Sequence, residues 1–224
     1  MKKLTLAIAT ASALMGATAA QAEVEVSASA AVSNMYLWRG QNLGSQGADD
    51  SANAVPAVSG DLVVSAAGAY AGVWTSSGDT FAGQEYDIFA GYGGEAGALS
   101  YDLSVWAYVY PDGGESNGTF GDNSEVILSL GFADASVSIY KQVGDEVDND
   151  NMYYTVGYGV GPVSATYGMA DGAAEDGDYS HLDVSYAHND NLSFTLSKIV
   201  SEEEEDTYDT DTKVVVTYSL PIEL

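Results

Sequence analysis

The sequence contains no cysteine, few prolines and few basic residues. Its 224 residues include 4 Pro, 2 His and 6 Lys or Arg, against 33 Asp or Glu. Because disulfides are excluded, the fold must be held by a core or by backbone pairing. The net charge of −27 makes nucleic acid a poor partner, so we expect none.

Long apolar segments are missing except at the N-terminus. There, Lys2 and Lys3 precede an apolar core, and Ala20-Gln21-Ala22 has the small-x-small pattern of a cleavage site. We therefore expect residues 1–22 to be a secretory signal peptide and residues 23–224 to form one domain. Cleavage would leave 4 basic residues against 33 acidic ones, a net charge of −29. Elsewhere no apolar run approaches the ~20 residues of a membrane helix.

Instead, the chain shows apolar and polar residues in strict alternation. In Gln84–Pro111, two alternating segments flank the glycine-rich turn Gly93–Gly97. One face of each segment is apolar, and the other carries carboxylates, hydroxyls and aromatic rings. This pattern predicts a β-hairpin. Alone, the hairpin fits a soluble sandwich, a soluble barrel with the apolar face inside, or a membrane barrel with that face against lipid.

The lengths of the connections favour the membrane barrel. Twelve such strands follow one another from about residue 24, the first being 24–39, and long loops alternate with short turns. The long loops are expected at 40–55, 76–83, 112–123, 142–151, 170–178 and 201–211. We predict a transmembrane antiparallel up-and-down β-barrel of about twelve strands, with short periplasmic turns and long acidic extracellular loops.

The alternation also assigns side chains to the two faces of the wall. Aromatic residues on the apolar face are expected to form belts at the lipid boundary: Tyr36, Trp38, Tyr86, Tyr92, Tyr101, Tyr154, Tyr158, Tyr167 and Tyr218. Polar and aromatic residues of the opposite face are expected to line the lumen: Arg39, Asp61, Glu85, Asp87, Asp102, Trp106, Tyr108, Glu125, Asp183 and Lys213. Inside the lumen, Arg39 is placed to pair with Glu85 or Asp87.

Several of these segments together resemble a known family. They are Tyr36–Gly40, Pro56–Gly60, Tyr70–Trp74, Glu85–Tyr92 and Tyr108–Pro111. Over residues 34–111 the sequence is similar to the TorF-type porin family of Gram-negative outer membranes. The resemblance implies an outer-membrane barrel whose solute is not established. The chain departs from the usual barrel-assembly signal because it ends in Leu224 rather than an aromatic residue.

The remaining residue clusters favour no catalytic or metal chemistry. His181 and His188 lack metal-type spacing, and Ser180 beside His181 is no signature of a catalytic triad. Acidic clusters at 145–150, 171–178 and 202–211 lack the spacing of a calcium loop. We therefore expect no enzyme activity, no cofactor and no metal site, and interpret the clusters as hydrated loops.

The function predicted from the sequence is passive passage of small solutes through an outer-membrane, porin-like barrel. An acidic lumen would favour cations. The inward rings of Trp106, Tyr108 and Tyr110 either form a slide for a sugar or an apolar solute or fill space in a narrow lumen. Lys141 and Lys198 are placed to meet lipopolysaccharide. Expected partners are outer-membrane lipid, lipopolysaccharide, the barrel-assembly machinery and small solutes or cations. The alternatives are a non-conducting barrel whose loops serve adhesion or surface hydration, and a soluble periplasmic barrel that binds an apolar ligand.

Overall fold

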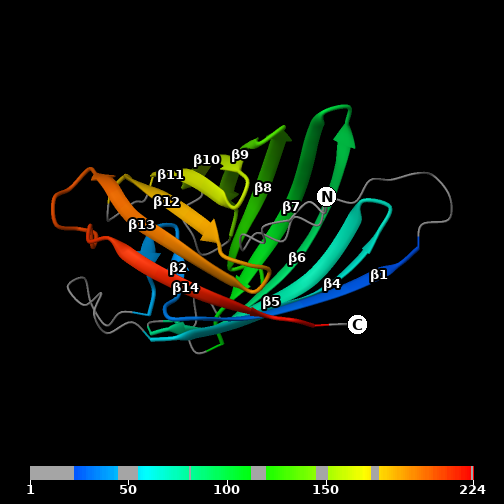
Figure 1. Ribbon diagram of the computed structural model, residues 1–224, viewed down its shortest axis with the longest axis horizontal. Coiled ribbons are helices and arrows are strands. Elements are labelled where there is room, and N and C mark those ends of the chain that lie inside the picture. Colours follow the sequence, from blue (N-terminus) through cyan, green and yellow to red (C-terminus); the bar gives the residue numbers. More distant parts are fainter. Residues whose placement is uncertain are drawn as a thin grey trace.

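The computed structural model describes residues 23–44, 55–80, 82–111, 120–144, 151–172, 177–222 and 224. Within these ranges the chain is all-β, and twelve of its strands close into one antiparallel barrel (Figure 1). No helix in the described ranges is long and apolar enough to cross a membrane. The predicted all-β fold, an antiparallel barrel of twelve strands, is confirmed.

Each barrel strand pairs with its neighbours along the chain. The barrel strands are β1 (Glu25–Ser33), β4 (Ala57–Ala66), β5 (Ala69–Asp79), β6 (Gly83–Ala96), β7 (Leu99–Val109), β8 (Asn123–Phe132), β9 (Ala135–Gln142), β10 (Met152–Val160), β11 (Val163–Asp171), β12 (Tyr179–Ala187), β13 (Leu192–Glu202) and β14 (Lys213–Leu220). Strand β1 closes the ring by pairing with both β4 and β14. Two further strands, β2 (Leu37–Trp38) and β3 (Gln41–Asn42), form a separate hairpin.

The connections alternate between short and long, with one exception. Short turns such as Ala67-Gly68 and Gly161-Pro162 gather at one end of the barrel. The segment 76–83, expected to be a loop, is mostly strand, because the β5–β6 ladder continues past a bulge to the pair Asp79↔Gly83. Only residues 80–82 connect these two strands.

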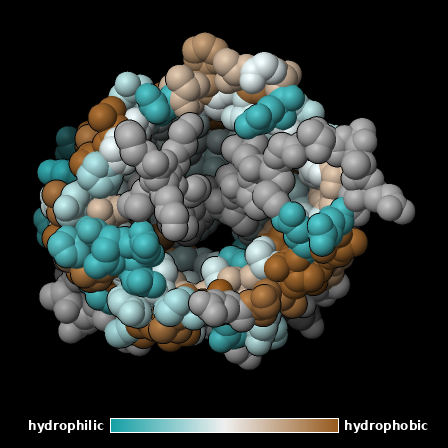
Figure 2. All heavy atoms as spheres, turned by 45° about the vertical axis from the view of Figure 1, so that its right-hand side comes forward, coloured by the Kyte–Doolittle hydropathy of each residue, from teal (hydrophilic) through white to brown (hydrophobic). Residues whose placement is uncertain are grey.

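The outer surface of the barrel is apolar. Along β6, exposed Tyr86, Ile88 and Tyr92 alternate with buried Glu85 and Asp87. The same alternation recurs around the ring, so apolar side chains face outward over the height of the strands. Figure 2 views the molecule from the side of the short turns and shows hydrophobic residues on the flanks and hydrophilic residues nearer the rim. A soluble barrel with an apolar interior would have the opposite arrangement.

The first strand is shorter than predicted because Asn34 ends it. The Asn34 side chain donates to the Val214 carbonyl at 3.0 Å and accepts from the Val216 amide at 2.7 Å. These bonds prolong the β1–β14 ladder by one residue. The chain then leaves the wall, and Met35 and Tyr36 are buried. The β2–β3 hairpin therefore belongs to an inward-folded segment, residues 34–44, which we call the inner hairpin.

Candidate functional site

The tip of the inner hairpin is a strained two-residue turn. The pairs Leu37↔Asn42 and Trp38↔Gln41 flank Arg39 and Gly40. Both turn residues have positive φ, 48° for Arg39 and 82° for Gly40. Tight hairpin turns require this geometry, and glycine adopts it easily, whereas arginine rarely does. A side chain held in such a conformation is often one that function requires.

Arg39 is fixed by charge pairing and by aromatic rings. Its Nη2 lies 2.7 Å from both carboxylate oxygens of Glu125 on β8. Its guanidinium carbon lies 4.4 Å from the ring centre of Trp38, 4.2 Å from that of Tyr153 and 5.0 Å from that of Tyr140. Burial lowers the pKa of Arg39, but the charge of Glu125 and neighbouring groups outweighs it, so the pKa is raised. Arg39 therefore stays charged inside the barrel.

Further contacts fasten the rest of the inner hairpin to the wall. The Tyr36 hydroxyl donates to Glu85 on β6, and the Gln41 amide donates to the Tyr179 hydroxyl on β12 at 2.9 Å. Gly40 packs so closely on His181 that a Cβ at position 40 would lie 2.6 Å from the His181 Cβ. The inner hairpin thus contacts β6, β8 and β12, which lie on different sides of the barrel.

His181 belongs to a buried polar chain beside the inner hairpin. Its Nε2 lies 2.6 Å from the Tyr153 hydroxyl, and its Nδ1 lies 3.1 Å from an Asp183 carboxylate oxygen. Ser180 and His181 are both buried, and the register between β12 and β13 shifts between these two residues. Ser180 Oγ has no hydrogen-bond partner among the described residues. The histidine therefore contacts tyrosine and aspartate and is not hydrogen-bonded to the adjacent serine.

A cavity of about 310 Å³ lies against the inner hairpin. Two polar groups of residues line it, the pair Arg39–Glu125 and a row of amides, Asn123, Gln142 and Asn151. Aromatic rings form much of the remaining wall: Trp38, Tyr108, Tyr110, Tyr153, Tyr179 and Tyr208. Polar, charged and aromatic side chains thus converge where the inner hairpin meets the wall.

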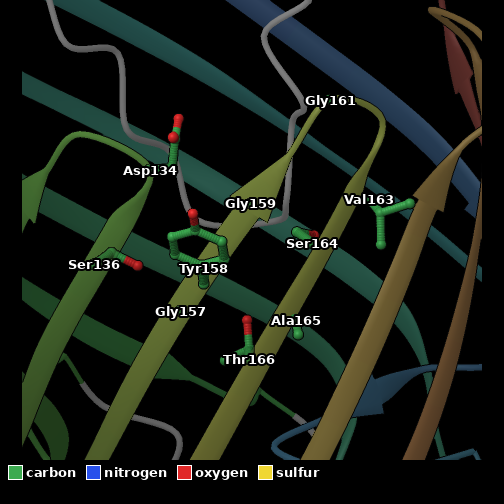
Figure 3. A pocket seen from close by; sticks show the side chains of 10 residues that line it. All are labelled: Asp134, Ser136, Gly157, Tyr158, Gly159, Gly161, Val163, Ser164, Ala165 and Thr166. Atoms are coloured by element: carbon green, nitrogen blue, oxygen red, sulfur yellow. The ribbon is translucent and has the colours of Figure 1, made fainter.

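A second hollow of about 310 Å³ lies nearer the short turns (Figure 3). Its lining comes from β9, β10 and β11 and their turns. Small residues predominate in this lining, including Ser136, Gly157, Gly159, Ser164 and Thr166. The lining of this hollow therefore differs from that of the cavity beside the inner hairpin, where aromatic rings predominate.

Of the residues predicted to line the lumen, Arg39 lies on the inner hairpin and the others lie on the inward side of the barrel strands, and some have partners other than those predicted. Arg39 pairs with Glu125 and not with Glu85 or Asp87, whose carboxylates lie at other inward positions. Tyr108 also donates to Glu125, at 2.7 Å. The others contact nearby groups: Asp61 with Ser29, Asp102 with Tyr70, Trp106 with Phe89, Asp183 with His181 and Lys213 with Asp209.

Two of the predicted belt residues lie elsewhere. Tyr36 is 9% exposed and bonded to Glu85, and Trp38 lines the inner cavity. The belt prediction is wrong for both, because strand β1 ends before them. The other predicted belt residues lie on the outward face of strands: Tyr86, Tyr92, Tyr101, Tyr154, Tyr158, Tyr167 and Tyr218. Tyr186, exposed near the end of β12, was missed although the alternation marks it.

The acidic loops are described only in part. The cluster at 145–150 and residues 175 and 176 lie outside the described residues, as does the predicted signal peptide. In the last loop, Lys213 Nζ donates to the Asp209 carbonyl at 2.6 Å and lies 3.5 Å from the Asp209 carboxylate. Within the described ranges, no three His, Cys, Asp or Glu side chains are grouped so as to hold a metal ion.

Comparisons with known proteins give a family and a structural likeness. Residues 17–219 match the family described as "Bacterial protein of unknown function (Gcw_chp)". No curated protein sequence matches the chain. Outer membrane phospholipase A from Escherichia coli matches with 11% identity and a TM-score of 0.44, over 86% of this chain and 88% of that one. An active-site mutant of the same phospholipase matches with 12% identity and a TM-score of 0.45, over 95% of this chain and 93% of that one.

Proposed function

The chain belongs to the Gcw_chp family of bacterial proteins of unknown function, and we propose that it is a porin-like barrel of the outer membrane. Small solutes would pass through its lumen by diffusion, past a constriction made by the inner hairpin. Residues 1–22 would direct export, and outer-membrane lipid would surround the apolar wall. This proposal agrees with the resemblance of residues 34–111 to the TorF-type porins.

The distribution of polarity supports a membrane location. Leu103, Val105 and Leu128 are exposed on the outer face, although each is a large apolar side chain. In lipid a closed barrel pairs every backbone group and presents such side chains to hydrocarbon. The strands of 8–14 residues are long enough to cross the membrane at a tilt. Exposed Lys198 would contact lipopolysaccharide, and the barrel-assembly machinery would insert the chain.

The observation that carries the proposal of a constricted passage is the position of Arg39. Arg39 lies at the tip of the inner hairpin and is paired with Glu125 on strand β8 of the barrel wall. This pair would narrow the lumen at the level of the inner hairpin. Charged and aromatic groups concentrate there, whereas the hollow nearer the short turns is lined by small residues. A solute would therefore be selected at the inner hairpin.

The charges of the lumen support a preference for cations. Among the residues predicted to line it, two are basic and six are acidic, namely Asp61, Glu85, Asp87, Asp102, Glu125 and Asp183, and of the six Asp61, Asp102 and Asp183 are only partly buried. Arg39 is neutralised by Glu125, and Lys213 is held by Asp209 and by carbonyl oxygens. Charges of one sign in a low-dielectric channel raise the local concentration of counter-ions.

A planar bilayer tests this proposal directly. We expect discrete conductance steps from the purified protein and, in a salt gradient, a reversal potential of the sign for cations. The preference should weaken as salt shortens the Debye length from ~30 Å at 0.01 M to ~3 Å at 1 M. A reversal potential of the opposite sign would exclude cation preference.

A non-conducting barrel is the second candidate, because the inner hairpin occupies part of the lumen. In that case the acidic loops would serve surface hydration or adhesion. The absence of conductance steps from protein that shows the heat-modifiable gel mobility of a folded barrel would favour it. Catalysis is not proposed, because Ser180 is not bonded to His181.

A further inference from the structure

We propose that the cavity beside the inner hairpin binds a small neutral polyhydroxylated solute of the size of a monosaccharide. This inference rests on the proposed function and names the class of solute for the constriction. The cavity, of about 310 Å³, lies at the lower end of the range of small-molecule sites. Three features of the lining indicate this class of solute: the aromatic rings, the amide side chains and the charged groups.

The rings supply flat apolar surfaces of the kind that contact the C–H faces of a sugar. Tyr179 and Tyr208 lie with ring centres 4.4 Å apart at an angle of 41°, and both line the cavity. Trp38 lines it as well and remains 36% exposed, the most accessible of the three. The face of an aromatic ring is negative and attracts weakly positive C–H groups.

The amides supply donors and acceptors together. Gln142 donates to Asn123 at 3.2 Å, and Asn151 donates to Gln142 at 2.9 Å. This row leaves the side-chain oxygen of Asn151 buried and without a partner among the described residues. A buried acceptor without a donor costs free energy. A solute hydroxyl would satisfy this oxygen once the Asn151 amide turns toward the cavity, because a hydroxyl donates as well as accepts.

The charge of the cavity argues against ionic solutes. The guanidinium of Arg39 is paired with Glu125, and it lies over the rings of Trp38 and Tyr153. An anion would have to displace that carboxylate, and a cation would have to displace Arg39 from the rings. Asp171, the other charged residue of the lining, is exposed to solvent. A fully apolar solute would leave the amide row unsatisfied.

The test uses glucose as the probe and Trp38 as the reporter. In the variant Trp74→Phe/Trp106→Phe, Trp38 is the remaining tryptophan, because the sequence has 3. We expect glucose to change its emission saturably in detergent. Asn151→Ala should weaken glucose binding about five- to tenfold, the loss of one hydrogen bond. Asn151→Asp, which keeps an acceptor, should lose less.

Ser136→Ala is the matched control, because Ser136 lines the other hollow. Glucose affinity should be unchanged in this variant. Each variant is first required to show the gel mobility of the folded barrel. An equal loss of affinity in Ser136→Ala and Asn151→Ala would overturn the assigned site. No saturable response to glucose, or a stronger response to tetramethylammonium or inorganic phosphate, would overturn the solute class.

Failure of this inference is distinguishable from failure of the proposed function. A barrel that conducts ions while glucose changes neither its current nor the emission of Trp38 would remain a pore without this site. A barrel that never conducts, but whose Trp38 responds to glucose, would retain the site and lose the proposed passage. If both hold, glucose should interrupt the ionic current of single channels, and it should do so less in Asn151→Ala.

Discussion

At the scale of single residues, the pair Arg39–Glu125 is the main electrostatic contact of the lumen. The two side chains are 14% and 7% exposed, so water screens their interaction little. Glu125 accepts from both Arg39 and Tyr108. Removing one partner of such a pair leaves a buried charge uncompensated, which costs more than the pair itself contributes.

Glu125→Gln should therefore destabilise the barrel markedly. We expect the free energy of unfolding to fall by about 3 kcal/mol, because Arg39 would stay charged without its carboxylate. Urea titration of the refolded protein in lipid vesicles measures this change. Asp61→Asn is the control, since the Asp61 carboxylate accepts a hydrogen bond from Ser29 and is less buried than Glu125.

The double variant Arg39→Met/Glu125→Leu distinguishes the contribution of the charge pair to stability from that of the packing around it. Replacing both members with apolar residues removes the unpaired charge, so stability should return to within about 1 kcal/mol of the natural protein. If the double variant instead lost as much stability as Arg39→Met and Glu125→Leu lose together, the two residues would act independently.

The sequence predicts which face a residue occupies better than which residue it meets. Alternation within a strand assigns Glu85, Asp87 and Glu125 to the inward face. It cannot select Glu125 as the partner of Arg39, because the two residues are 86 positions apart and meet across the lumen. The belt prediction failed at Tyr36 and Trp38 for a related reason, since the alternation continues unchanged where the strand ends.

At the scale of elements, the inner hairpin depends on where β1 stops. Asn34 makes two side-chain hydrogen bonds to the backbone of β14, and the chain turns inward at the next residue. The seam between β1 and β14 is short, with four residue pairs from Ala30↔Leu220 to Ser33↔Thr217. Those bonds therefore fasten the inner hairpin and extend the ladder that closes the barrel.

Asn34→Ala should loosen both the inner hairpin and the ladder between β1 and β14. We expect a loss of about 1–2 kcal/mol, because two hydrogen bonds disappear. Amide hydrogen exchange should be faster for residues 35–44 and for the Val216 amide, while β8 and β9 stay protected. Asn191→Ala is the matched control, because Asn191 bonds β14 at its other end, through the Ser219 carbonyl. Unchanged exchange in the inner hairpin would contradict this role of Asn34.

At the scale of the whole molecule, the barrel reverses the usual arrangement of a soluble protein. Leu103 is 53% exposed near the middle of β7, while Glu85 on the neighbouring strand is 2% exposed. The number of strands, their order and the side of the wall on which each side chain lies were all predictable, because the alternation and the pattern of loop lengths repeat along the chain. The inner hairpin was not, because it breaks that repetition once.

Leu103→Lys tests the facing of the wall. A lysine at the lipid midplane should lower the stability in vesicles by about 2–4 kcal/mol. Thr166→Lys, at an inward position that lines the hollow nearer the short turns, should be tolerated much better. The measurement is urea-dependent refolding into phospholipid vesicles. Equal losses for both variants would contradict an outward apolar wall.

Single-channel conductance tests the central claim, that the inner hairpin constricts an aqueous passage. The comparison is between the natural protein and a variant in which residues 35–43 are replaced by a short Gly-Ser linker. We predict small conductance steps for the natural protein and steps severalfold larger for the variant, both favouring cations. Equal conductance of the two proteins, or silence of both in the folded state, would contradict the claim.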